Sequence, residues 1–104
     1  MTTADAYDAA ADLIEKSGWC QDGFGYTPDE PHCIVGAIAQ ITGSRRHEPL
    51  QRMLQEEDRL SCNWSSAYGP VVAWQHSLNL EDGEQITVRA LRRAARQLRE
   101  GKLA

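Results

Sequence analysis

This sequence of 104 residues lacks several features of membrane and secreted proteins. No apolar run approaches the roughly 20 residues that a membrane-spanning helix needs, so no membrane insertion is expected. The first residues contain no basic segment followed by an apolar one, so no secretory signal is expected. No CxxC spacing occurs, and three cysteines leave at least one unpaired, which argues against a disulfide framework. These absences predict a cytoplasmic protein with reduced thiols.

Internal repeats, low-complexity tracts and interdomain linkers are also missing, so residues 1–104 are predicted to form one helical domain. The hydrophobic fraction of 41% and the charged fraction of 25% are ordinary for a globular chain with a single modest core. The net charge of −4 argues against general binding to polyanions, although it permits a local basic patch.

Apolar residues recur at helical spacing in five segments that proline, glycine or polar loops separate. We therefore expect an all-α fold, a small orthogonal bundle of about five short helices near residues 4–17, 31–42, 49–59, 70–78 and 88–100. Thr3 is expected to cap the first helix, Pro31 to begin the second, and Thr87 to cap the last. Gly18 and Gly43 are expected to end the first two helices.

The helical spacing also predicts which residues are buried. The expected core comprises the apolar positions of each helix: Tyr7, Ala10, Ala11, Ile14, Ile34, Val35, Ile38, Ile41, Leu50, Met53, Leu54, Val71, Trp74, Leu78, Val88, Leu91, Ala95 and Leu98.

Cys33 is the sharpest candidate for chemistry, because the sequence Glu30-Pro31-His32-Cys33 puts its thiol in the first turn of a helix. Unpaired backbone N–H groups and the helix dipole at that position would lower the pKa of the thiol. His76 would then be the candidate base of a small cysteine-dependent enzyme. The more common role of such a cysteine is a small buried residue, and no enzymatic activity is favoured.

A metal site is not predicted either, because the potential ligands lack the close pairing of a structural zinc site. Those residues are Cys20, His32, Cys33, His47, Cys62 and His76. No cofactor is predicted.

Charge is strongly segregated between the first and last helices. The basic face of the last helix consists of Arg89, Arg92, Arg93, Arg96 and Arg99, opposite Leu91 and Leu98. The acidic face of the first helix consists of Asp5, Asp8, Asp12 and Glu15. Both faces are expected to point away from the core and not to neutralise each other across it. The two faces are either simply exposed to solvent or are binding surfaces. As a binding surface, the basic face would bind phosphates or an acidic partner.

Trp64 lies in the polar stretch Ser61 to Ser66. An exposed tryptophan there would be an anchor for a partner, whereas one folded back would cover the core.

Three short motifs occur in a fixed order along the chain. They are Gly18-Trp19-Cys20-Gln21, Cys33-Ile34-Val35-Gly36-Ala37 and Trp74-Gln75-His76. Their order and spacing resemble a family of short actinobacterial and actinophage proteins known only as a domain of unknown function, with the pattern G-W-x-Q, C-x-x-G-A and W-N-D. The resemblance covers roughly residues 4–98 and departs at Gln75 and His76, so any site built on that Asn and Asp is in doubt. It implies an origin but no mechanism.

We therefore predict a small accessory protein of actinobacterial phage or prophage type in the host cytoplasm. It would bind an unknown host or phage protein through its segregated acidic and basic helix faces. The alternatives are a nucleic-acid-binding protein that uses the arginine face and the cysteine-dependent enzyme. The oligomeric state and the partner are not predicted.

Overall fold

A computed structural model of the chain describes residues 1–21, 29–43, 48–57 and 70–103. Within these ranges the chain forms five helices and a single isolated β-bridge, which confirms the expected all-α bundle. The helices are α1 (Thr3–Ser17), α2 (Ile34–Thr42), α3 (Glu48–Glu57), α4 (Pro70–His76) and α5 (Gly83–Arg99).

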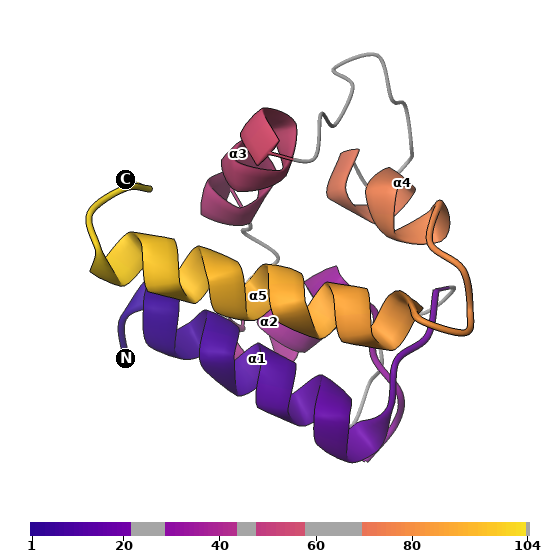
Figure 1. Cartoon of the computed structure of the whole chain (residues 1–104). Coiled ribbons are helices and arrows are strands. Elements are labelled where there is room, and N and C mark those ends of the chain that lie inside the picture. The colour runs from indigo at the N-terminus through magenta and orange to yellow at the C-terminus, as the bar shows by residue number, and fades with distance from the viewer. Residues whose placement is uncertain (22–28, 44–47, 58–69, 104) are drawn as a thin grey trace.

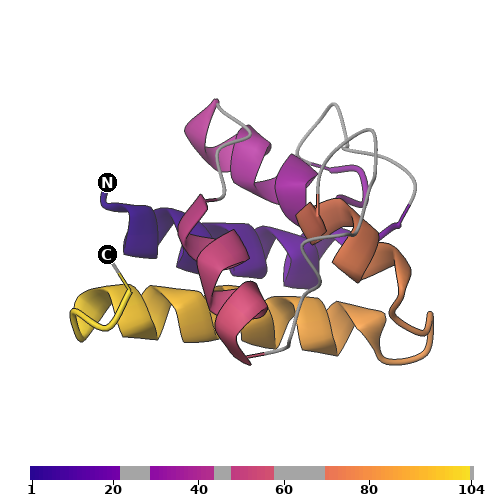
Figure 2. The same cartoon turned by 90° about the horizontal axis from the view of Figure 1, so that it is seen from above.

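The two longest helices, α1 and α5, run antiparallel side by side and share the most extensive contact between any two helices in the described ranges (Figure 1). Seen from above, α3 crosses this pair, while α2 lies along the side of α1 that faces away from α5 (Figure 2). Helix α4 packs against α2 and α3. The core therefore lies between the α1–α5 pair and the three short helices.

The start of α1 is fixed one residue earlier than the sequence analysis expected. Thr2, not Thr3, is the N-cap residue, because its hydroxyl accepts a hydrogen bond from the Asp5 backbone N–H at 3.1 Å. The Asp5 carboxylate in turn accepts from the Thr2 backbone N–H at 3.4 Å, which completes a capping box. At the other end Gly18 has a φ of 98°, a conformation that favours glycine, and ends the helix as expected.

The second helix begins at Ile34, so the expectation that Pro31 begins it was wrong. His32 instead pairs with Trp19 in a parallel bridge. The His32 N–H donates to the Gly18 carbonyl and the His32 carbonyl accepts from the Cys20 N–H, both at 3.1 Å. Because these bonds require an extended backbone, the helix starts only after Cys33, which is its N-cap.

The last helix begins at Gly83, about one turn before the expected cap at Thr87, which is buried inside the helix. Gly83 lies directly against the ring of Trp19, because a β-carbon placed on Gly83 would be 2.3 Å from the Trp19 ring. Only glycine therefore permits this contact. The expected last helix, near residues 88–100, did not include Gly83, because a glycine at a helix start is a weak signal.

The remaining two helices differ slightly from their expected bounds. Helix α3 begins at Glu48 and is described to Glu57, so the expected end at residue 59 lies outside the described ranges. Helix α4 ends at His76 instead of residue 78, because the next two backbone N–H groups bond to the Trp74 and Gln75 carbonyls in tight turns.

The expected core is largely the observed one. Most of the expected residues are buried, and Ile41, Leu78, Val88 and Leu98 are partly buried and pack against them. The buried polar residues His32 and Gln75 were not anticipated, and neither was the burial of Thr87.

Tyr7 connects the helix pair to the overlying helices. Its ring is buried, and its hydroxyl oxygen accepts a hydrogen bond from the Leu50 backbone N–H at 3.3 Å. Leu50 is in the first turn of α3, where backbone N–H groups have no partner within the helix. Tyr7 therefore satisfies one of these groups while filling the core, and burial raises the pKa of Tyr7 to about 12.

This raised pKa predicts a loss of stability at alkaline pH. The unfolded tyrosine has a pKa of about 10, so its contribution is fully present below about pH 10 and is lost as the pH rises towards 12. A shift of about two pKa units corresponds to a loss of at most about 3 kcal/mol. Urea unfolding at several pH values should show a smaller alkaline loss for Tyr7→Phe than for the wild type. Equal losses would contradict this role.

Candidate functional site

The three motif segments meet around the side chain of Gln75. Its amide oxygen accepts one hydrogen bond from the Trp19 indole N–H at 3.0 Å and another from the Ile34 backbone N–H at 2.6 Å. The Gln75 side chain is fully buried. One buried oxygen thus joins the segment after α1 and the first turn of α2 to α4. We call Trp19, Gln21, Cys33, Ile34 and Gln75 the motif junction.

Gln21 forms the outer part of the motif junction. Its side-chain amide donates to the Leu78 carbonyl at 2.8 Å and to the Gln75 carbonyl at 3.4 Å. These carbonyls lie at and just after the end of α4, where the helix itself offers no donor. The backbone carbonyl of Gln21 also bonds to the ring nitrogen Nε2 of His76. The motif residues therefore hold one another in place.

Cys33 is placed at a helix start as expected, but its electrostatics are the reverse of the expectation. The sulfur accepts a hydrogen bond from the Gly36 backbone N–H at 3.3 Å and the side chain is 2% exposed. Burial raises the pKa of the Cys33 thiol and outweighs the opposing hydrogen bonds from backbone N–H groups. The expected lowering of this pKa was wrong, because the helix start lies inside the protein and not at its surface.

The proposed base, His76, does not reach this thiol. His76 is exposed and bonds to the Gln21 carbonyl, and in the described part of the chain no hydrogen bond joins it to Cys33. Of the two catalytic candidates, Cys33 is therefore in the core and His76 is at the surface, each with its own partner. This arrangement does not assemble a nucleophile and a base.

His32 lies fully buried beside Cys33. In the described ranges neither of its ring nitrogens has a hydrogen-bond partner, and the same holds for the Gln75 amide nitrogen. The described residues also contain no group of three or more His, Cys, Asp or Glu side chains placed to hold a metal ion.

The motif junction leads to a stability prediction. Gln75→Leu would leave the Trp19 indole and the Ile34 N–H buried without acceptors, at an expected cost of about 2–4 kcal/mol. Gln85→Leu, at an exposed position in α5, should change the free energy of unfolding by less than about 0.5 kcal/mol. Chemical denaturation of both variants would measure this. A Gln75→Leu protein as stable as the wild type would contradict the assigned role of the amide oxygen.

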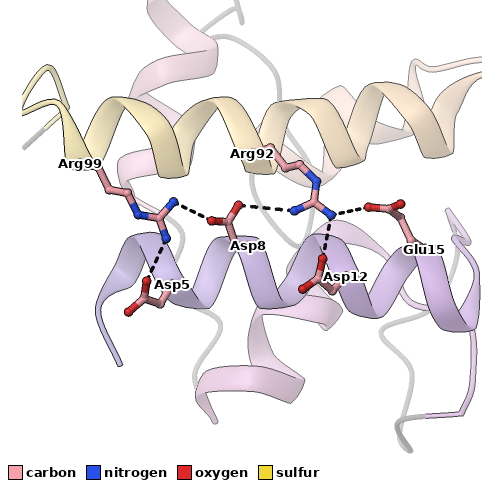
Figure 3. Close-up of polar contacts among 6 residues, drawn as sticks. All are labelled: Asp5, Asp8, Asp12, Glu15, Arg92 and Arg99. Atoms are coloured by element: carbon pink, nitrogen blue, oxygen red, sulfur yellow. Dashed lines mark hydrogen bonds and ion pairs between the residues drawn. The ribbon is translucent and has the colours of Figure 1, made fainter.

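The acidic face of α1 and the basic face of α5 come together at the surface. The Arg92 guanidinium donates to Asp12 at 2.7 Å and also bonds to Glu15, and it lies 3.5 Å from Asp8 (Figure 3). Arg99 donates to Asp8 at 2.6 Å and to Asp5 at 2.8 Å. Asp8 thus lies between the two arginines. We call these six residues the charge network.

The expectation that the two faces do not neutralise each other was therefore wrong. Because α1 and α5 are antiparallel neighbours, their polar edges lie side by side, and the long arginine side chains of α5 reach the carboxylates of α1 (Figure 3). These contacts favour the charged forms of Asp5 and Arg92, so they lower the pKa of the acid and raise the pKa of the base. Hydrogen bonds from Arg99 are the largest cause of the lowered pKa of Asp5, and bonds to Asp12 and Glu15 raise the pKa of Arg92.

The other predicted binding residues have different surroundings. Arg96 lies 3.6 Å from Glu100 on its own helix, Arg93 is half-buried, and Arg89 is exposed. Trp64 lies outside the described residues. Four carboxylates surround the two arginines of the charge network, so this edge carries an excess of negative charge. These carboxylates reduce the positive potential that Arg92 and Arg99 offer to a polyanion.

The charge network gives a salt-dependent prediction. Arg92→Gln should lower the free energy of unfolding by about 1 kcal/mol or less at low ionic strength, because exposed ion pairs are weak. The loss should shrink in 1 M salt, where the screening length falls to about 3 Å. Arg89→Gln is the matched control, since Arg89 is on the same helix and outside the network. Denaturation in low and high salt measures both, and equal losses for the two variants would contradict the network.

A surface hollow of about 580 Å³ lies where the start of α1 meets the end of α2 and the start of α3. Its wall is mainly apolar, with Tyr7, Ile38, Ile41 and Pro49 among the lining residues. Polar groups also line it, namely Thr2, Thr3, Thr42 and Glu48. The volume is within the range of ligand-binding pockets. The sequence did not predict this hollow, because it forms between the start of α1 and the distant stretch from the end of α2 to the start of α3.

The described structure is thus a small helical protein whose sequence motifs meet in a buried junction. In the described ranges no helix is both long enough and apolar enough to cross a membrane. The chain belongs to the Family of unknown function (DUF6197), whose model matches residues 1–103. This confirms the resemblance to a domain of unknown function. No curated protein and no solved structure matches the chain.

Proposed function

We propose that this protein acts without catalysis, by binding another protein whose apolar side chain enters the hollow lined by Tyr7, Ile38, Ile41 and Pro49. The hollow is the observation that carries the proposal. It combines an apolar wall with Thr2, Thr3, Thr42 and Glu48, and protein interfaces have this arrangement of an apolar centre within polar surroundings. A single buried anchor side chain supplies much of the affinity in such interfaces.

Charge defines the chemistry of the partner. Glu48 lines the hollow and is exposed, and within the described ranges it has no ion-pair partner. The first turn of α1 lines the same hollow and also carries Asp5, one of the carboxylates of the charge network. The chain as a whole has a net charge of −4. The partner is therefore a protein with an apolar anchor flanked by basic residues, which the acidic side of α1 attracts.

The biological setting of this proposal is that of an accessory protein of actinobacterial phage or prophage type, acting in the host cytoplasm on a host or phage protein. The order and spacing of the three sequence motifs support it.

The two alternative functions have less support. Nucleic-acid binding by Arg89, Arg92, Arg93, Arg96 and Arg99 is disfavoured by the carboxylates that surround Arg92 and Arg99. A cysteine-dependent activity of Cys33 is disfavoured by the burial and the raised pKa of the thiol.

The test places a photo-crosslinking residue at position 41, in the hollow, and at position 80 as a control. Leu80 is an apolar residue that is 76% exposed and does not line the hollow. Any protein that crosslinks at position 41 but not at position 80 is purified. Its affinity is then measured for the wild-type chain and for the Ile41→Glu and Leu80→Glu variants.

We expect Ile41→Glu to weaken binding at least about 100-fold, the loss typical of a buried anchor, and Leu80→Glu to leave it within about threefold. Binding should also weaken with salt. The proposal fails if no protein crosslinks at position 41, or if Ile41→Glu binds as tightly as the wild type.

A further inference from the structure

The isolated bridge between Trp19 and His32 places two cysteines opposite each other. Both residues of the bridge are followed directly by a cysteine, Cys20 after Trp19 and Cys33 after His32. The two segments run parallel, with the Cys20 N–H donating to the His32 carbonyl at 3.1 Å. In a parallel pair the residues that follow two paired residues face each other on the same side.

This register brings the two backbones within the range that a disulfide requires. Neighbouring strands lie about 4.8 Å apart, and disulfides join α-carbons roughly 4.4–6.8 Å apart. The Cys33 backbone is extended, with φ of −78° and ψ of 171°, so the segment after the bridge stays extended as far as that residue. The Cys20 sulfur reaches the facing segment, where it donates to the Pro31 carbonyl at 3.6 Å.

Electrostatics agrees with this proximity. Burial is the main cause of the raised pKa of Cys33, and the negative charge of a Cys20 thiolate raises it further. A charge–charge effect weakens with distance, so its presence is consistent with the short separation that the bridge gives the two residues.

We propose that Cys20 and Cys33 are a redox-responsive pair, which remains a dithiol under reducing conditions and forms an intramolecular disulfide in the presence of a small-molecule disulfide such as oxidised glutathione. The pair is a modification site, and it is independent of the binding function proposed above.

The reaction balances in two exchange steps. The half-buried Cys20 loses its proton, and its thiolate attacks one sulfur of oxidised glutathione. A mixed disulfide forms and one glutathione thiol leaves with a proton. Cys33, which is buried, then loses its proton and attacks the Cys20 sulfur. The Cys20–Cys33 bond forms and the second glutathione leaves as a thiol. The two cysteines lose two electrons and two protons, and oxidised glutathione gains them.

The Cys20–Cys33 disulfide would connect the segment that follows α1 to the N-cap of α2, beside the motif junction. It would close a short loop that contains residues 21–32, and closing such a loop restricts the unfolded chain. Oxidation should therefore raise the melting temperature, and reduction should restore the lower value.

The experiment incubates the full chain with oxidised glutathione and follows it by intact mass and by peptide mapping. Cys62→Ser removes the third thiol, while Cys20→Ser and Cys33→Ser each remove one member of the pair. The expected result is a mass lower by two hydrogens and a mapped Cys20–Cys33 link in both wild type and Cys62→Ser. The melting temperature should rise by several degrees, reversibly on reduction.

Either single variant of the pair should stop at the mixed disulfide or remain a thiol, without the rise in melting temperature. Serine is a good N-cap residue, so Cys33→Ser is expected to fold. The proposal is overturned if Cys62→Ser keeps two alkylatable thiols, or if it accumulates glutathione on Cys20 without releasing it. It is also overturned if the mapped link in the wild type involves Cys62 or a second chain.

Discussion

The antiparallel contact between α1 and α5 supports every other feature of this protein. Asp5 in the first turn of α1 and Arg99 at the end of α5 are 94 residues apart in the sequence, yet they bond to each other. Helix α2 packs on α1 and α3 packs on α5, and α4 in turn packs on α2 and α3. The polar edges of α1 and α5 meet in the charge network. Burial of apolar side chains provides most of the stability of such a contact, and the exposed ion pairs align the two helices. The hollow and the motif junction exist only because the short helices are seated on this pair.

The motif junction gives a structural role to residues of the three sequence motifs. Gln21 and Cys33 each bond to a backbone group at a helix end. The Gln75 side-chain oxygen accepts from the Trp19 indole and from the Ile34 backbone N–H. A buried oxygen that accepts two hydrogen bonds contributes more to stability than either bond alone, because its removal leaves both buried donors without an acceptor. The departure from the family pattern at Gln75 therefore retains a polar group where one is needed.

The sequence alone predicted the all-α fold and most of the large apolar side chains of the core, since helical spacing reports directly on burial. It did not predict the burial of Ala90, Ala94 and Leu103. It failed where backbone pairing or distant contacts decided the outcome. Proline at position 31 is a strong helix-start signal, but the bridge at His32 overrode it. The start of α5 depends on the ring of Trp19 lying against Gly83, and no local signal encodes that contact. The meeting of the two charged faces was missed because amphipathicity gives the inner side of each helix but not its neighbour. The hollow and the cysteine pair were missed for the same reason, as each requires the relative placement of separate segments.

The separation of α1 and α5 along the chain also bears on biosynthesis. While the ribosome is still extending the polypeptide, α1 has been released but its main packing partner has not yet been made. Until α5 emerges, the apolar stripe of α1 can be covered only in part, by α2. Closure of this distant contact is entropically costly and slow compared with local helix formation. A nascent chain is therefore exposed to aggregation until α5 has been made. Chaperones that bind exposed apolar surface would protect it until then.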